Sequence, residues 1–236
     1  MSEPALTAVV MAAGEGQRLR PLTDRWPKPI LPLAGRPVVA TLLRELAAAR
    51  IQRVWVVTGH LAEQVERLVG DGSAFGLDVA FARQPERLGS ADALQRALAA
   101  GARPPLLATA ADTLYRPGDL GRAAARWLAS DAPGGLGVRV GGGPGRTPVR
   151  VEGGYVNAIG EEGSSRRTGA PLWFLSQQLT GELAALPGPP YELAEAFRAA
   201  LERGTPILAL ELGPTRDITR PADVVLENFP YLWAEA

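Results

Sequence analysis

The sequence of 236 residues contains no cysteine, a single histidine and, among its 25 basic residues, a single lysine. Without cysteine the chain forms no disulfide framework, no thiolate zinc site and no thiol nucleophile, which excludes a secreted scaffold held by disulfides. Net charge is also absent, because 25 acidic residues balance the basic ones. A neutral chain has no overall attraction for phosphate backbones or anionic lipids, so we expect neither nucleic acid nor a membrane as its main partner.

Long apolar runs are missing too, since none approaches the roughly 18 residues that cross a bilayer. The N-terminus carries Glu3 and Pro4 where a secretory signal would be basic. We therefore expect a cytoplasmic protein. Apolar residues still make up 46% of the chain, enough for a sizeable core, and the length suits one large domain. Nothing in the helical faces indicates an oligomeric state, so both a monomer and a homo-oligomer stay open.

Apolar, β-branched runs alternate with segments of helical periodicity along the chain. The runs predict strands at residues 6–11, 53–58, 77–82, 105–109 and 207–212. The first helix follows Pro37, and further helices are predicted at residues 60–69, 90–100, 117–128, 191–203 and 221–234, with Ser90 as an N-cap. Such alternation predicts an α/β fold, a Rossmann-like three-layer αβα sandwich around a mostly parallel, mixed sheet. Residues 132–167, rich in glycine and proline, predict a small β-rich excursion beside that sheet.

The most informative cluster of residues follows the first predicted strand and reads AAGEGQRLRPLTDRWPKP. Gly14 and Gly16 allow backbone amides to approach a phosphate with no side chain in the way. Arg18 can fork onto phosphate oxygens, and Lys28 adds a compact charge between two prolines. A glycine turn before a proline-rich surface loop is the alternative interpretation. The stretch has neither the third glycine of a dinucleotide fingerprint nor the Gly-Lys-Ser/Thr ending of a Walker loop, which argues against a dinucleotide-dependent oxidoreductase.

The order of several motifs resembles the sugar-1-phosphate nucleotidylyltransferases, also called nucleoside-diphosphate-sugar pyrophosphorylases. The motifs are AAGEGQRLRPLTDRWPKPILPLAGRP, GDGSAFGLDVAF, QPERLGSADAL, LLATAADTLY and TRDITRPADVVLEN, and together they span most of the chain. The resemblance implies one nucleotidyltransferase domain over residues 1–236, with a nucleotide-binding part at about 1–131 and a sugar-phosphate-binding part at about 132–236. Because no left-handed β-helix repeat follows the last motif, we expect a short form without that C-terminal domain.

The resemblance implies an enzyme that joins a nucleoside triphosphate to a sugar 1-phosphate, giving an NDP-sugar and pyrophosphate. The backbone of the loop would hold the base and phosphates, Arg18 would grip the triphosphate, and Lys28 would bind phosphate at the reacting centre. The loop residues concerned are Ala12, Ala13, Gly14, Glu15 and Gly16. The attacking phosphate oxygen is already ionised at neutral pH, so positioning and charge stabilisation replace a general base. The single histidine, His60, is accordingly interpreted as a turn or cap residue.

Two aspartates match the family's magnesium carboxylates. Asp112 closes the apolar run 106–111, and Asp217 lies in the DITRP stretch near the end. Mg²⁺ prefers hard oxygen ligands and is commonly held by one or two carboxylates together with substrate phosphates. By themselves both residues also fit turn or capping roles, so their pairing as metal ligands, and Asp112 as a catalytic residue, rest on the resemblance.

Gln84 and Gly89 match positions that read a pyrimidine in the uridylyl and thymidylyl members, which favours UTP or dTTP. A glutamine amide can pair with both a carbonyl and a ring NH of uracil or thymine, and a polar loop residue before Pro85 is the alternative interpretation. Asp92 replaces a small residue and either favours its helix N-terminus or accepts from a sugar hydroxyl. The base preference leaves open a cytidylyl- or guanylyltransferase for a sugar, polyol or amino-alcohol phosphate.

The sugar side departs from the family pattern. The usual Glu-Lys-Pro before the strand that lines the sugar phosphate is replaced by IGEEGSSRRTGAPLWF, so its lysine is missing. Arg166 or Arg167 can supply that charge as substrate-binding residues, and a surface arginine pair is the simpler reading. The sugar is therefore not identified. An altered sugar side also leaves open a nucleotide-sensing or partner-binding protein with reduced turnover.

Overall fold

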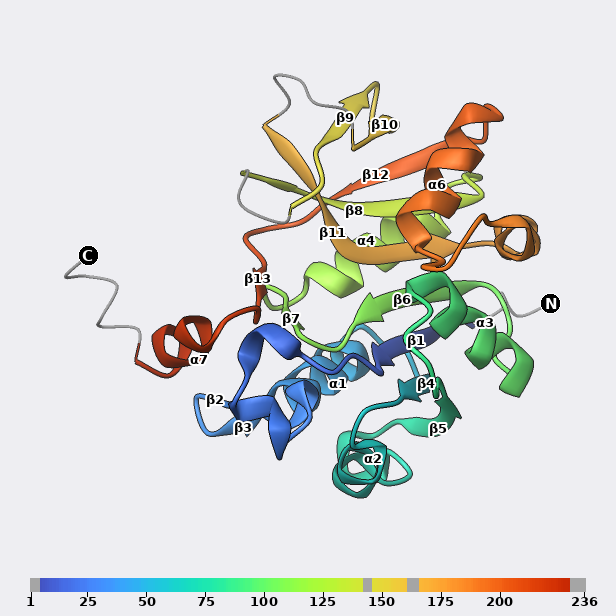
Figure 1. Ribbon diagram of the computed structural model, residues 1–236. Coiled ribbons are helices and arrows are strands. Elements are labelled where there is room, and N and C mark those ends of the chain that lie inside the picture. Colours follow the sequence, from blue (N-terminus) through green and yellow to red (C-terminus); the bar gives the residue numbers. More distant parts are fainter. Residues whose placement is uncertain (1–4, 142–145, 161–165, 230–236) are drawn as a thin grey trace.

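One mixed β-sheet forms the centre of the computed structural model, which describes residues 5–141, 146–160 and 166–229. Its nine strands run in the order β5-β4-β1-β6-β11-β8-β12-β10-β9, from the bottom to the top of Figure 1. The strands are β1 (Thr7–Ala12), β4 (Arg53–Thr58), β5 (Asp78–Arg83), β6 (Leu106–Ala110), β8 (Gly134–Val140), β9 (Val149–Glu152), β10 (Tyr155–Ile159), β11 (Arg167–Leu175) and β12 (Ile207–Glu211).

The first four strands in this order are parallel, whereas β11 is antiparallel to both of its neighbours, β6 and β8. Two small ladders lie outside this sheet. They join β2 (Pro32–Leu33) to β3 (Arg36–Pro37) and β7 (Thr113–Leu114) to β13 (Arg216–Asp217). The expected mostly parallel, mixed sheet is thus confirmed, with the antiparallel strands in the half that follows residue 131.

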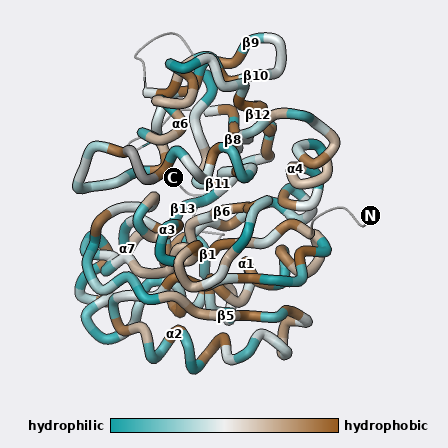
Figure 2. The backbone as a smooth tube through the Cα atoms, turned by 90° about the vertical axis from the view of Figure 1, so that its right-hand side faces the viewer, coloured by the Kyte–Doolittle hydropathy of each residue, from teal (hydrophilic) through white to brown (hydrophobic). Residues whose placement is uncertain are grey.

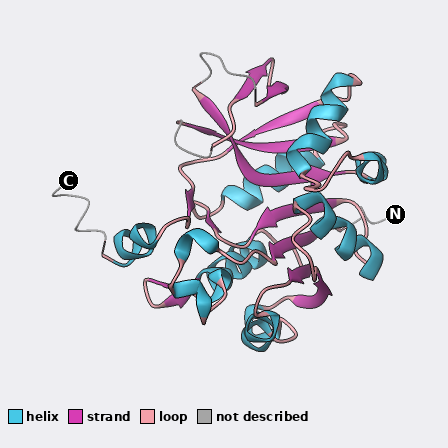
Figure 3. Ribbon diagram, in the orientation of Figure 1, coloured by secondary structure: helices cyan, strands magenta, loops and turns pink. Residues whose placement is uncertain are grey.

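Helices cover both faces of the sheet (Figure 3). One apolar cluster includes residues of α1 (Val38–Ala48), α2 (Ala62–Val69) and α4 (Asp119–Leu128). The other includes residues of α3 (Ser90–Ala100), α5 (Gln177–Gly181) and α6 (Leu193–Glu202). In Figure 2 apolar segments gather along β1 and β6 in the middle of the molecule. Because the parallel strands are buried on both sides, they read as near-continuous apolar runs, which is why the sequence predicted them.

The predicted elements agree with the structure to within a residue or two at most ends, and residues 53–58 and 90–100 coincide with β4 and α3. The helix expected at 221–234 is observed as α7 (Pro221–Asn228), and residues 230–236 lie outside the described part. This helix is anchored on the β2–β3 hairpin, because the Asn228 side chain accepts from the Ala34 amide at 2.9 Å and donates to the Pro32 carbonyl at 3.0 Å (Figure 1).

Two expectations need correction. The glycine-rich segment after residue 132 is no excursion beside the sheet, since β8 lies inside it between β11 and β12, and β9 and β10 extend its edge. Glycine at position 135 serves packing: a Cβ there would lie 2.9 Å from side-chain atoms of Leu210 and Trp127. Ser90 does not cap α3, whose N-cap position is held by Gly89. Its hydroxyl accepts instead from the Leu193 amide at the start of α6, at 2.8 Å.

Candidate active site

The glycine loop begins where β1 ends and leads into three short 3₁₀ turns, Gln17–Leu19, Leu22–Asp24 and Lys28–Ile30. Gly16 has a φ of +63°, and a Cβ there would lie 2.9 Å from the Thr23 methyl group and 3.3 Å from the Lys28 Cβ. The Thr23 hydroxyl also donates to the Gly16 carbonyl at 2.9 Å. The loop therefore packs so closely on the following turns that glycine is required, and this packing brings Lys28 beside the loop.

Two cavities adjoin this loop. The smaller, of about 400 Å³, is lined by Ala12, Gly14, Glu15 and Gly16, together with Arg18, Lys28, Asp112 and Arg87. The larger, of about 1070 Å³, is lined by Arg18, Lys28, Asp112 and Asp217 among others. Arg18, Lys28 and Asp112 thus belong to both cavities and lie where the two meet. Ala13 lines neither cavity, and its carbonyl accepts from the His60 amide at 3.3 Å.

Glu15 organises the exposed side of the loop. Its carboxylate accepts from the side-chain amide of Gln17 at 2.9 Å and pairs with Arg87 at 3.5 Å and Arg20 at 3.9 Å. The Gln17 hydrogen bond, and next the charge of Arg87, hold the pKa of Glu15 below its usual range. Glu15 therefore stays ionised at neutral pH and keeps Arg87 beside the smaller cavity. Sequence analysis did not single out Arg87.

The two candidate metal carboxylates are brought together by a short ladder between distant parts of the chain. Asp112 follows β6, β7 begins at the next residue, and β7 pairs with β13 so that Thr113 opposes Asp217. The Ile218 amide donates to the Asp112 carbonyl at 3.2 Å, and the Thr113 hydroxyl donates to the Asp217 carboxylate at 2.9 Å. In Figure 1 β6 ends on the side where β7 and β13 lie, the carboxyl edge where ligands bind in such folds.

Each carboxylate is paired with a cation. Lys28 Nζ contacts Asp112 Oδ2, and Arg139 Nη2 lies 2.8 Å from Asp217 Oδ2. Both acids are partly accessible, with 23% and 27% of their side chains exposed, whereas Arg139 is only 4% exposed. Within residues 5–141, 146–160 and 166–229, no group of three or more acidic, histidine or cysteine side chains could hold an ion by itself. Two hard oxygen donors facing a cavity nevertheless fit Mg²⁺, which takes further ligands from phosphates and water.

Gln84 lies just after β5, 7% exposed, and its amide nitrogen donates to the Gly89 carbonyl at 2.9 Å and to Asp92 Oδ2 at 2.8 Å. Both amide hydrogens are thereby used, so in this arrangement only the amide oxygen is available to a base. The expectation that this amide both donates to and accepts from a base therefore does not fit the geometry. Asp92 is also paired with Arg96 at 3.3 Å. Gln84, Gly89 and Asp92 line neither of the two cavities.

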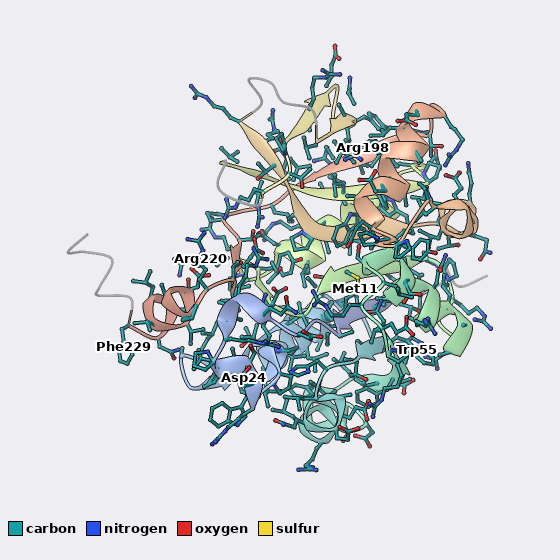
Figure 4. The ribbon with its side chains drawn as sticks, in the orientation of Figure 1. Met11, Asp24, Trp55, Arg198, Arg220 and Phe229 are labelled. Carbon is teal, nitrogen blue, oxygen red and sulfur yellow. The ribbon has the colours of Figure 1, made fainter. Side chains whose placement is uncertain are left out.

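The two arginines expected on the sugar side are not among the residues that line the cavities. Neither Arg166 nor Arg167 lines either cavity, and Arg167 pairs with Glu211 at 3.2 Å. Arg139 and Arg146 line the larger cavity instead. The sequence feature that could have indicated this cavity is Arg139 itself, a charged residue at the end of the buried stretch GGLGVR. Arg220, where α7 begins, also lines this cavity, and Figure 4 labels it near β13.

His60, as expected, has a local role, since its ring contacts the Thr23 carbonyl at 3.1 Å.

A mixed sheet with a glycine loop after its first strand, and with Asp112 and Asp217 both lining one cavity, defines an α/β protein with a candidate ligand site at the carboxyl edge of its sheet. Residues 7–150, more than half of the chain, match the family model described as nucleotidyl transferase. The chain belongs to the nucleotidyl transferase family, and the resemblance inferred from its motifs is confirmed. In the described residues no helix is long and apolar enough to cross a membrane.

Two curated relatives illustrate the similarity. The N-acetylmuramate alpha-1-phosphate uridylyltransferase of Neisseria meningitidis serogroup B is 40% identical over 80 residues, which are 34% of this chain and 35% of that protein. The bifunctional protein GlmU of Acidovorax ebreus is 32% identical over 233 residues, covering 89% of this chain and 47% of that protein. The chain thus spans less than half the length of these relatives.

Solved structures confirm the fold. A putative glucose-1-phosphate thymidylyltransferase from Bacillus anthracis superposes with a TM-score of 0.86 at 18% identity, covering 95% of this chain and 94% of that one. The inositol-1-phosphate CTP transferase from T. maritima gives a TM-score of 0.80 at 18% identity, covering 92% and 90%. The Rossmann-like αβα architecture is therefore confirmed.

Proposed function

We propose that the protein transfers a nucleoside monophosphate from a nucleoside triphosphate to a sugar 1-phosphate, releasing pyrophosphate. The observation that carries this proposal is the junction of the two cavities at Arg18, Lys28 and Asp112. The smaller cavity, beside the glycine loop, suits the triphosphate, and the larger has room for the acceptor. The expected division of one domain into a nucleotide-binding part and a sugar-phosphate-binding part is also part of this proposal.

In this reaction an acceptor phosphate oxygen attacks the α-phosphorus. The bond from that phosphorus to the oxygen bridging to the β-phosphate breaks, and pyrophosphate departs with the electron pair. No proton has to be removed from the attacking oxygen. Arg18 binds the departing phosphates, and Lys28 binds oxygens of the α-phosphate, where it stabilises the charge that develops during displacement. For this, Lys28 leaves Asp112, its partner in the free protein.

We further propose Mg²⁺ as the metal, held by Asp112 and Asp217 together with substrate oxygens. When bound, it would neutralise phosphate charge at the reacting centre. The residues fit this assignment because both acids face the larger cavity and keep part of their surface accessible. The loop backbone from Ala12 to Gly16 is the proposed cradle for the nucleotide phosphates.

For the nucleotide we propose UTP or dTTP. Gln84 supports this choice, because an amide oxygen fixed as an acceptor matches the N3–H donor of uracil and thymine, whereas N3 of cytosine is itself an acceptor. The two solved neighbours are named for different nucleotides, so the fold by itself does not select a base.

The test is pyrophosphate release from UTP, dTTP, CTP, GTP or ATP, each paired with a panel of sugar and polyol 1-phosphates, with and without Mg²⁺. We expect release with UTP or dTTP and one acceptor class, and loss of release without Mg²⁺. Asp112→Asn should abolish it, whereas Asp78→Asn should not, because Asp78 is an exposed aspartate paired with Arg53 outside both cavities. Absence of release across the panel, with nucleotide still bound, would overturn the transferase proposal in favour of a sensing protein.

A further inference from the structure

Arg139 is a charged side chain in β8 that directly follows the buried, apolar residues 134–138. It lies near the end of β8 with 4% of its side chain exposed and lines the larger cavity. A guanidinium group keeps its proton in proteins, so a buried one needs an anionic partner. In the free protein that partner is Asp217, and the Thr215 hydroxyl accepts a second hydrogen bond. Arg139 Nε is buried with no partner among the described residues, so the donors of this arginine are not all used.

A second arginine is tied to the same residue. Arg146 Nη2 donates to the Thr215 carbonyl at 3.4 Å, and its side chain lines the same cavity. Two guanidinium groups therefore converge on Thr215, with Asp217 two residues away. Cations gathered in this way create a positive potential that favours an anion in the cavity between them.

The ion pair between Arg139 and Asp217 competes with the proposed role of Asp217. If Asp217 carries a divalent metal, its oxygens are drawn toward that metal, and Arg139 loses much of the charge that compensates its own. A buried guanidinium left without a counter-ion is strongly unfavourable. A new anion must therefore approach Arg139 as the metal binds, and the acceptor substrate brings a phosphate group into this cavity.

We propose that Arg139 and Arg146 bind the phosphate group of the acceptor, and that Asp217 is the counter-ion of Arg139 only in the free protein. This proposal rests on the proposed function and names the residues that replace the missing family lysine. Arginine suits this role, since its planar fork binds two phosphate oxygens at once. Metal binding and acceptor binding are then coupled. The metal draws Asp217 away from Arg139, and the acceptor phosphate compensates the positive charge that Arg139 then carries alone.

The first experiment separates the two substrates kinetically, with the acceptor that proves active in the panel. Arg139→Met should raise KM for the acceptor roughly tenfold to a hundredfold and leave KM for the nucleotide within about twofold of the wild type. Arg139→Lys should restore part of the acceptor affinity. Arg203→Met is the matched control, because Arg203 is also paired with a carboxylate, that of Glu182, but lies exposed and outside both cavities. An unchanged acceptor KM in Arg139→Met, or a rise produced by Arg166→Gln or Arg167→Gln instead, would overturn the proposal.

The second experiment needs no turnover. Inorganic phosphate is titrated into the wild type and into Arg139→Met by calorimetry, with and without Mg²⁺. We expect Mg²⁺ to tighten phosphate binding to the wild type and to have no such effect on the variant. If Arg139→Met does not fold, as judged by thermal unfolding, Arg146→Met carries the same test. Phosphate binding that is equal in all these proteins refutes the proposal, whereas a wild type silent across the panel refutes only the transferase reaction.

Discussion

Replacing Asp92 by leucine tests whether the buried Asp92 carboxylate fixes the orientation of the Gln84 side-chain amide, and so which atom of that amide faces a base. Asp92 is 9% exposed at the side chain and accepts from the Gln84 amide nitrogen at 2.8 Å. Leucine has the same branching at Cγ but larger terminal groups, and it has no acceptor. The Gln84 amide nitrogen then loses one of its two acceptors. The flipped orientation of the amide, with oxygen and nitrogen exchanged, becomes closer in free energy to the native orientation.

The structure sets the scale of the effect. A buried donor left without its partner costs about 1–3 kcal/mol, and about 1.4 kcal/mol corresponds to a factor of ten. With the amide free to turn, its nitrogen can face the N3 acceptor of cytosine. We therefore expect the ratio of kcat/KM for UTP to kcat/KM for CTP to fall about tenfold in Asp92→Leu.

Two variants serve as controls for this measurement. Asp92→Asn keeps an acceptor oxygen beside Gln84 and should retain most of the preference. Arg96→Gln removes the ion pair of Asp92 at 3.3 Å without touching Gln84, so it should leave the ratio within about twofold. An unchanged ratio in Asp92→Leu, with the variant folded and active, would refute the argument that Asp92 orients Gln84.

Four further predictions concern the loop, the reacting centre and the packing. Lys28→Ala should lower kcat by at least about a hundredfold, as for loss of one group that stabilises the transition state, with an unfolding temperature close to that of the wild type; near-normal activity would contradict its role. Gly16→Ala, at a φ of +63° and with its Cβ 2.9 Å from Thr23, should lower the free energy of unfolding in urea by about 1–2 kcal/mol. Ser90→Ala removes the acceptor of the Leu193 amide and should cost about 1 kcal/mol in the same assay; no change would mean that α6 does not depend on this bond. Gly135→Val should cost about 1–3 kcal/mol or more through overpacking against Trp127 and Leu210, and a stable variant would contradict the close packing of β8.

Local patterns predicted the parallel half of the fold well because each of its elements carries its own signal. The run at β4 is rich in valine, and α1 repeats Val39, Leu42, Leu43 and Leu46 at helical spacing. In β8 the pattern misled for a physical reason. Its glycines are there because neighbouring side chains occupy the space that a Cβ would need, and glycine composition by itself indicates loops.

The candidate site also contains one part that local sequence predicts and one part that it does not. The glycine loop with Arg18 and Lys28 is contiguous in sequence, so its chemistry could be predicted locally. Asp112 and Asp217 are brought together by the ladder of β7 and β13, and the periodicity of a sequence cannot indicate that such distant residues are paired. Their association was predicted from the family resemblance.

Arg139 shows why the sugar side could not be predicted by searching near the missing lysine. A cation needed at one point in a cavity can come from any strand whose side chains face that cavity, because the phosphate responds to charge and distance and not to chain position. β8 lies next to β11 in the sheet, so a residue on it can supply a charge that the sequence around Arg166 and Arg167 was expected to provide. Burial distinguishes the two arginines. Arg167 is paired at the surface with Glu211, whereas the buried Arg139 is paired with Asp217, the carboxylate to which we assign the metal in the proposed reaction.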